Sequence, residues 1–185
     1  MTSGAIRVAL SLALVGALAG APGCAMLFGG GVTSAVPTAR GLGGSVRMTA
    51  WMEPLDEGVR APLEPAPFLG ATIGADVGEF GWRTVIEANL GFVFPLAEVV
   101  LWHARVGLAP VALGHRQTDP DPDAWFGLSA SATTGLLFGQ SRGGVVIGFE
   151  GTVAQDIAYA IPGSGTYLSA LLTLGFYLGG DLSSR

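Results

Sequence analysis

Apolar and polar residues alternate with a period of two over most of this chain. The clearest stretch runs from Trp82 to Leu113, where two alternating runs flank a break at 95–98. Because successive side chains of a strand point to opposite faces, the pattern predicts two long strands joined by a tight turn. The members of the apolar face are Trp82, Thr84, Ile86, Ala88, Leu90, Phe92, Phe94, Val100, Trp102, Ala104, Val106 and Leu108.

The same alternation predicts five further strands, at 42–52, 68–78, 125–139, 145–161 and 167–178. The proline-rich segment 53–67 and the polar segment 114–124 interrupt the pattern and predict loops, since proline cannot donate to a strand ladder. Bacterial single-chain barrels have even strand numbers. We therefore expect 25–36 to form an eighth strand, although its weak alternation also allows a flexible tether.

The composition is unusual for a soluble domain, because half of the residues are apolar and only 12% are charged. Soluble domains carry about a quarter charged residues. No stretch after residue 40 is an uninterrupted apolar run of the roughly 20 residues that a spanning helix needs. A closed barrel satisfies all backbone groups between strands, so the sequence predicts an all-β, antiparallel, up-and-down transmembrane β-barrel of about eight strands.

Every charge within the predicted strands falls on the face opposite the apolar residues. A lipid-facing Arg at the bilayer midplane costs about 2–4 kcal/mol, so the apolar face is expected to contact lipid. In an eight-stranded barrel the interior is just wide enough for side chains, and buried charges must be paired. We expect a lumen network with three Arg balancing three acids, formed by Arg47, Asp76, Arg83, Glu87, His103, Arg105 and Glu150.

The N-terminus carries one Arg, an apolar run and then small residues, which predicts a cleaved secretory signal peptide at 1–23. Cys24 is the sole cysteine, which excludes an intramolecular disulfide. The segment Ala21-Pro22-Gly23-Cys24 resembles the lipobox of bacterial lipoproteins, which implies acylation of Cys24; cleavage after Ala21 is the alternative. The expected organisation is a signal peptide at 1–23, a tether or first strand at 24–40 and a barrel at 41–185.

Several classes of chemistry are disfavoured. A net charge of −5 argues against nucleic acid. The carboxylates of Asp119, Asp121 and Asp123 lack the glycine and spacing of a calcium loop, so we expect a solvated loop or cations that bridge lipopolysaccharide. The glycine-rich pieces match no phosphate-binding motif. We therefore expect no cofactor and no protein-held metal.

A hydrolase would need a nucleophile beside its base. Lipid hydrolases built on membrane barrels pair His with a Ser two residues along the same strand face, but here that position is Arg105. The candidate serines, Ser129 and Ser131, lie on another strand, and His115 lies in a loop. We therefore expect no enzyme, with His103 a hydrogen-bonded lumen residue.

Over residues 25–185 this pattern resembles the small eight-stranded outer-membrane barrels of the OmpA and OmpX types. The resemblance implies a membrane-embedded barrel in the outer membrane of a Gram-negative bacterium, and no specific activity. We expect a monomer with a structural or surface-interacting role. Its expected partners are outer-membrane lipid and, through the loops, lipopolysaccharide or an extracellular partner.

Two alternatives remain open. A lipid-anchored periplasmic barrel of lipocalin-like form would reverse the faces and bind an apolar ligand inside. An outer-membrane lipid-modifying enzyme would depend on His103. Aromatic residues near strand ends favour the membrane barrel, because they match interfacial girdles: Trp82, Phe92, Phe94, Trp102, Phe126 and Phe138.

Overall fold

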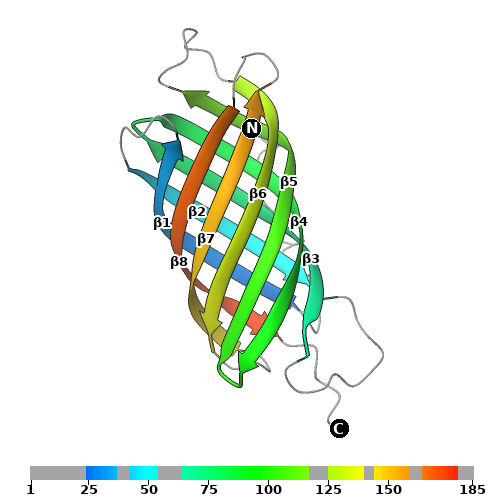
Figure 1. Cartoon of the computed structure of the whole chain (residues 1–185). Coiled ribbons are helices and arrows are strands. Elements are labelled where there is room, and N and C mark those ends of the chain that lie inside the picture. Colours follow the sequence, from blue (N-terminus) through cyan, green and yellow to red (C-terminus); the bar gives the residue numbers. More distant parts are fainter. Residues whose placement is uncertain are drawn as a thin grey trace, which may run out of the picture.

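The computed structural model describes residues 24–36, 42–53, 64–116, 125–139, 144–158 and 164–178. Within them eight antiparallel strands pair in sequence order, and β8 pairs with β1 to close a barrel of tilted strands (Figure 1). The predicted fold is therefore confirmed. The strands are β1 (Cys24–Val36), β2 (Gly43–Met52), β3 (Ala66–Gly78), β4 (Gly81–Ala97), β5 (Val100–Arg116), β6 (Trp125–Phe138), β7 (Gly144–Ala158) and β8 (Ser164–Leu178).

Strand β1 resolves the ambiguity between a tether and a strand. It pairs with β8 from Cys24 opposite Leu178 to Val36 opposite Thr166, and with β2 on its other side. Without β1, the edges of β2 and β8 would expose unpaired backbone groups to lipid. The predicted signal peptide at 1–23 lies outside the described residues.

The up-and-down order gives the barrel two distinct ends. We call the end where β1 begins and β8 ends the terminal end. The opposite end, where β1 ends and β8 begins, is the loop end. The tight turn Glu79-Phe80 lies at the loop end, and Gly81 follows it with a φ of 111°, a left-handed conformation that favours glycine. No helix long and apolar enough to cross a membrane occurs in the described parts of the chain.

A bulge in β5 reverses which residues face inward. Pairing with β6 shifts between Ala109 and Ala112, and pairing with β4 shifts opposite Glu87. Pro110 lies in this bulge, where its missing N–H breaks no regular ladder. Odd-numbered residues up to Ala109 are buried, whereas beyond the bulge Ala112 and Gly114 are buried. The one extra residue therefore changes the inward positions from odd-numbered to even-numbered residues along this long strand.

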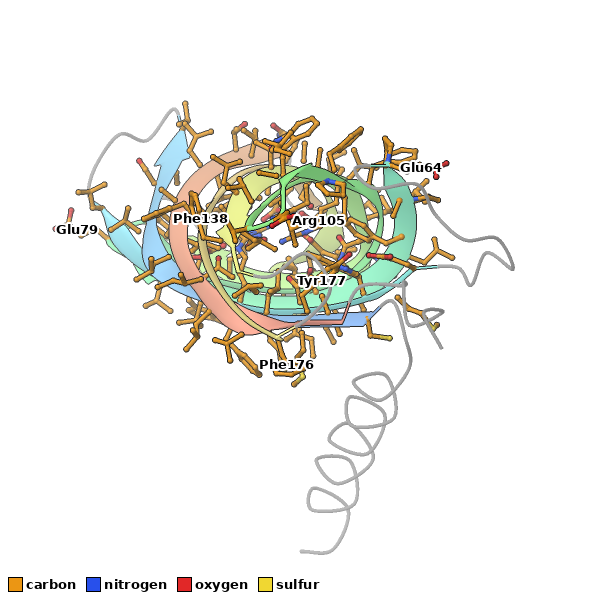
Figure 2. The ribbon with its side chains drawn as sticks, turned by 90° about the horizontal axis from the view of Figure 1, so that it is seen from below. Glu64, Glu79, Arg105, Phe138, Phe176 and Tyr177 are labelled. Atoms are coloured by element: carbon orange, nitrogen blue, oxygen red, sulfur yellow. The ribbon has the colours of Figure 1, made fainter. Side chains whose placement is uncertain are left out.

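The outer face of the barrel is apolar and the inner face carries the charges. Val106 is 59% exposed and Phe149 is 63% exposed, whereas Arg83 is 1% exposed. Figure 2 shows Arg105 within the ring of strands and Phe176 outside it. The lipocalin-like alternative is therefore wrong, because it required the apolar face to point inward.

The interior itself has three layers, a feature the sequence pattern did not predict. A large apolar cluster fills the terminal end, and a smaller apolar cluster lies at the loop end. Between them lies a polar layer that also holds a small apolar group of Val85, Ala109 and Ala112. The terminal cluster comprises Ala25, Leu27, Trp51, Ala66, Phe68, Val93, Leu101, Leu137, Val146 and Tyr177. The loop-end cluster comprises Ala35, Phe80, Ala154 and Tyr167. Trp51 stacks on Phe68 with ring centroids 4.5 Å apart, so the terminal end is packed as a core.

Candidate functional site

The seven residues predicted to face the lumen are all buried inside the barrel. None is more than 4% exposed, and they come from β2, β3, β4, β5 and β7. The structure brings six of them into two ion-paired clusters and leaves Glu87 outside both. We call these the Arg83 cluster, nearer the loop end, and the Arg105 cluster, nearer the terminal end.

Arg83 is the centre of the first cluster. Its Nη1 donates to Asp76 Oδ2 at 2.7 Å, and its Nε and Nη2 donate to the two Asp156 oxygens at 2.6 and 2.9 Å. Nη2 also donates to Ser129 Oγ at 2.9 Å, and the guanidinium lies 4.8 Å from the centroid of the Tyr167 ring. This forked geometry satisfies a buried guanidinium, whose burial would otherwise carry a large desolvation cost.

Strand register explains how these groups meet. Asp76 lies opposite Arg83 across β3 and β4, and Ser129 lies opposite Asp156 across β6 and β7. Closure of the barrel then places the two pairs face to face. Asp156 is 0% exposed and was missed in the sequence, although it shares the inward parity of Glu150 and Thr152.

The Arg105 cluster is built on the inward face of β5. Arg105 Nη1 donates to Glu150 Oε1 at 2.8 Å, and His103 Nε2 lies 3.1 Å from the same oxygen. Arg105 Nη2 lies 3.3 Å from Thr49 Oγ1, to which it donates. The His103 ring also packs against Trp51, with centroids 5.3 Å apart. This cluster therefore connects the polar layer to the terminal apolar cluster.

Arg47 belongs to the Arg83 cluster but is held more loosely. Its Nη2 lies 3.6 Å from Asp76 Oδ2 and donates to Ser169 Oγ at 3.3 Å. Ser169 in turn donates to Thr33 Oγ1. The Arg47 aliphatic chain passes Gly74, where a Cβ would make ordinary van der Waals contact with it.

Glu87 joins the lumen network through a hydrogen bond. It accepts from Ser131 Oγ at 3.0 Å, and no cation lies within 4.0 Å of it among the described residues. The expected balance of three Arg against three acids is wrong, because Asp156 and Glu53 are buried as well. Glu53 directly follows β2 and was assigned to a loop, yet it accepts a hydrogen bond from the Tyr177 hydroxyl at 2.8 Å.

Among the described residues, neither candidate serine is paired with His103 as a hydrolase would need. His103 is 0% exposed, and its ring contacts Glu150, Arg105 and Trp51. Ser129 is bonded to Arg83 and Ser131 to Glu87, so neither pairs with His103. Within the described strands, no three or more His, Cys, Asp or Glu side chains converge to hold a metal ion. His115 has no described side chain, and Asp119, Asp121 and Asp123 lie outside the described residues.

The outer surface carries aromatic side chains toward both barrel ends. Near the terminal end Phe94 lies between Phe92 and Trp102, with ring centroids 6.2 and 4.8 Å away. The Trp102 indole donates to Thr134 Oγ1 at 2.8 Å, so the polar atoms of both side chains are satisfied on this face. Trp82 and Phe126 lie toward the loop end. The two groups match the interfacial aromatic girdles of membrane barrels.

Barrel closure, an apolar exterior between aromatic girdles and inward charges together decide the fold class. The protein is a small, closed, eight-stranded antiparallel β-barrel with the apolar exterior and inward charges typical of membrane-spanning barrels. No protein-family model matches its sequence, and no curated protein matches it significantly. Among solved structures, the barrel matches the crystal structure of Ail, the attachment invasion locus protein of Yersinia pestis. The identity is 12% and the TM-score 0.48, over 84% of this chain and 99% of that chain.

Proposed function

We propose that this protein is a monomeric barrel in the outer membrane of a Gram-negative bacterium, with a closed, non-conducting lumen and a structural or surface-interacting role. The observation that carries the proposal is the Arg83 cluster, which links β3, β4, β6 and β7 through the interior. The packed terminal cluster around Trp51 and Phe68 closes the same interior further along. An eight-stranded barrel has no room left for a wide channel beside such side chains.

Conductance tests the closed lumen. The purified barrel, reconstituted in planar lipid bilayers, is expected to give no steady channel current. Trp51→Ala is the matched variant, because it removes the largest side chain of the terminal cluster and Trp51 itself forms no ion pair. A stable, porin-like current from the unmodified protein would contradict the proposal. Light scattering in detergent is expected to give the mass of one chain plus its micelle.

The loop end is the surface we propose for outside contacts. The polar segment 117–124 connects β5 to β6 at this end, and its polarity carries the proposal, because the longest connection between strands, 53–65, lies at the terminal end. Its three carboxylates, Asp119, Asp121 and Asp123, offer oxygens to divalent cations that also bridge lipopolysaccharide phosphates.

Binding of lipopolysaccharide with and without Mg²⁺ tests this contact. We expect Mg²⁺-dependent binding by the unmodified barrel and its loss when all three aspartates are changed to asparagine. Changing Glu79→Gln, an exposed acid in the short turn at the same end, serves as the control. Equal binding by the triple variant would exclude these carboxylates as the contact.

A further inference from the structure

The turn between β3 and β4 sends its two side chains in opposite directions. Glu79 is exposed, and Figure 2 shows it outside the ring of strands, whereas Phe80 is only 7% exposed. Short connecting segments normally run over the surface, so the burial of an aromatic ring at this position has a local cause. The Phe80 ring is turned back into the loop end of the barrel, where it joins the loop-end apolar cluster.

Two glycines on the inward parity of β2 and β3 form the seat of the Phe80 ring. A Cβ at Gly43 would lie 2.7 Å from Phe80 Cε1, and a Cβ at Gly78 would lie 2.6 Å from the same atom. Carbon atoms in favourable contact are about 3.5–4.0 Å apart. The ring therefore occupies space that a side chain at either glycine would need.

The other side of the Phe80 ring reaches strands across the interior. Phe80 packs edge-on against Tyr167 of β8, with ring centroids 5.6 Å apart and ring planes at 72°, a geometry that aromatic pairs prefer. Ala35 of β1 and Ala154 of β7 complete the same cluster. Since β1 and β2 separate β8 from β3 in the sheet, the contact with Tyr167 spans the loop end of the barrel.

Tyr167 links the Phe80 ring to the Arg83 cluster. The Arg83 guanidinium lies 4.8 Å from the centroid of the Tyr167 ring, and both residues are at most 2% exposed. From the turn inward, the contacts therefore run from Phe80 to Tyr167 and then to Arg83. Exclusion of water matters at this point, because water weakens the attraction between paired charges.

We propose that Phe80 is a plug that closes the loop end of the barrel and keeps water from Tyr167 and the Arg83 cluster. With the closed lumen proposed above, on which this inference rests, the plug supplies the seal at one end. The terminal cluster closes the other end separately. Because Phe80 belongs to a turn, its ring can leave the seat without breaking a strand ladder, so this end can open while the wall stays intact.

Hydroxyl-radical footprinting with mass spectrometry tests the plug, because the probe is close to water in size. Oxidation of Tyr167 in the micelle-bound barrel is compared with oxidation of Tyr177, which is buried in the terminal cluster. We expect both tyrosines to be protected in the unmodified protein. Phe80→Ala should raise oxidation of Tyr167 several-fold and leave Tyr177 unchanged. Phe149→Ala is the matched control, since it removes an exposed ring from the outer face of β7, and Tyr167 should stay protected.

Continued protection of Tyr167 in Phe80→Ala would overturn the plug. Increased oxidation of both tyrosines would also overturn it, because it would show general loosening of the barrel. If gel mobility without boiling shows that Phe80→Ala does not fold, Phe80→Leu takes its place. This variant should give a smaller rise at Tyr167, and no rise would again overturn the plug.

Conductance separates the plug from the closed lumen. Phe80→Ala is expected to give no channel current, because the terminal cluster around Trp51 still closes the other end. A current from the unmodified protein would contradict the closed lumen, whereas oxidation of Tyr167 decides the plug.

Discussion

Arg83 and Asp156 lie 73 residues apart in the chain and meet inside the barrel through two parallel hydrogen bonds of 2.6 and 2.9 Å. The contact joins β4 to β7, which are not neighbours in the sheet. Both side chains are at most 1% exposed. Their pairing therefore depends on closure of the barrel. Measuring the interaction between these two side chains tests whether the interior is assembled as described.

Breaking this pair should strongly destabilise the barrel. Asp156→Leu leaves a buried guanidinium with one of its two carboxylates removed, a change expected to cost about 3–5 kcal/mol. Urea unfolding of the barrel in micelles measures the loss. In a double-mutant cycle with Arg83→Met, the two changes should cost clearly less together than the sum of each alone. Additive losses would show that the two side chains do not interact.

Gly135 is expected to tolerate no side chain. A Cβ there would lie 2.7 Å from His103 Nε2 and 2.6 Å from the Phe149 carbonyl oxygen, so Gly135→Ala should cost about 1–3 kcal/mol by overpacking. Gly151→Ala is the matched control, because a Cβ at Gly151 meets nothing within 4 Å. Equal unfolding midpoints for the two variants would contradict the packing around His103 and Glu150.

Charge on the outer face should be penalised according to depth. Leu90 is 53% exposed near the middle of β4, so Leu90→Arg should cost about 2–4 kcal/mol in a lipid bilayer. Leu96 is 57% exposed at the end of the same strand, and Leu96→Arg should cost at most about 1 kcal/mol. Folding into vesicles compares the two variants. A soluble barrel would show no such difference with depth.

Removal of the His103 ring should affect stability and not lipid chemistry. His103→Ala deletes a contact to Glu150 and a ring packed on Trp51, so the unfolding midpoint should fall. Membrane lipid composition in cells that express the variant should equal that of cells expressing the unmodified protein. A specific change in phospholipid or lipopolysaccharide acylation would instead support the lipid-modifying alternative.

Acylation of Cys24 has a simple mass test. Cys24 is the first residue of β1 and is 2% exposed. An acyl group there would attach at the rim of the barrel, with no tether between anchor and fold. We expect the intact mass to carry the acyl groups and to lose them in Cys24→Ala. An unmodified mass that begins at Pro22 would instead establish ordinary cleavage after Ala21.

The alternation of residue types was enough to predict which side chains face inward. Arg47, Asp76 and Glu150 could be placed in the lumen without coordinates, because period two is a local property of an extended backbone and lipid tolerates charge on one face only. The same reasoning extends to Asp156, which lies within the predicted strand 145–161 and shares the inward parity of Glu150, although it was left out of the expected network.

Partner choice inside the barrel followed from no local pattern. Arg83 pairs with Asp156, whereas Glu87 has no cation within 4.0 Å among the described residues. These contacts join strands that are not neighbours in the sheet, so they depend on how the barrel closes and on the stagger between its strands. The burial of Glu53 depends in the same way on its contact with Tyr177. The change of inward positions at Pro110 depends on the pairing of β5 with β4 and β6. Backbone geometry along one strand sets the direction of each side chain, whereas the whole closed wall sets what that side chain meets.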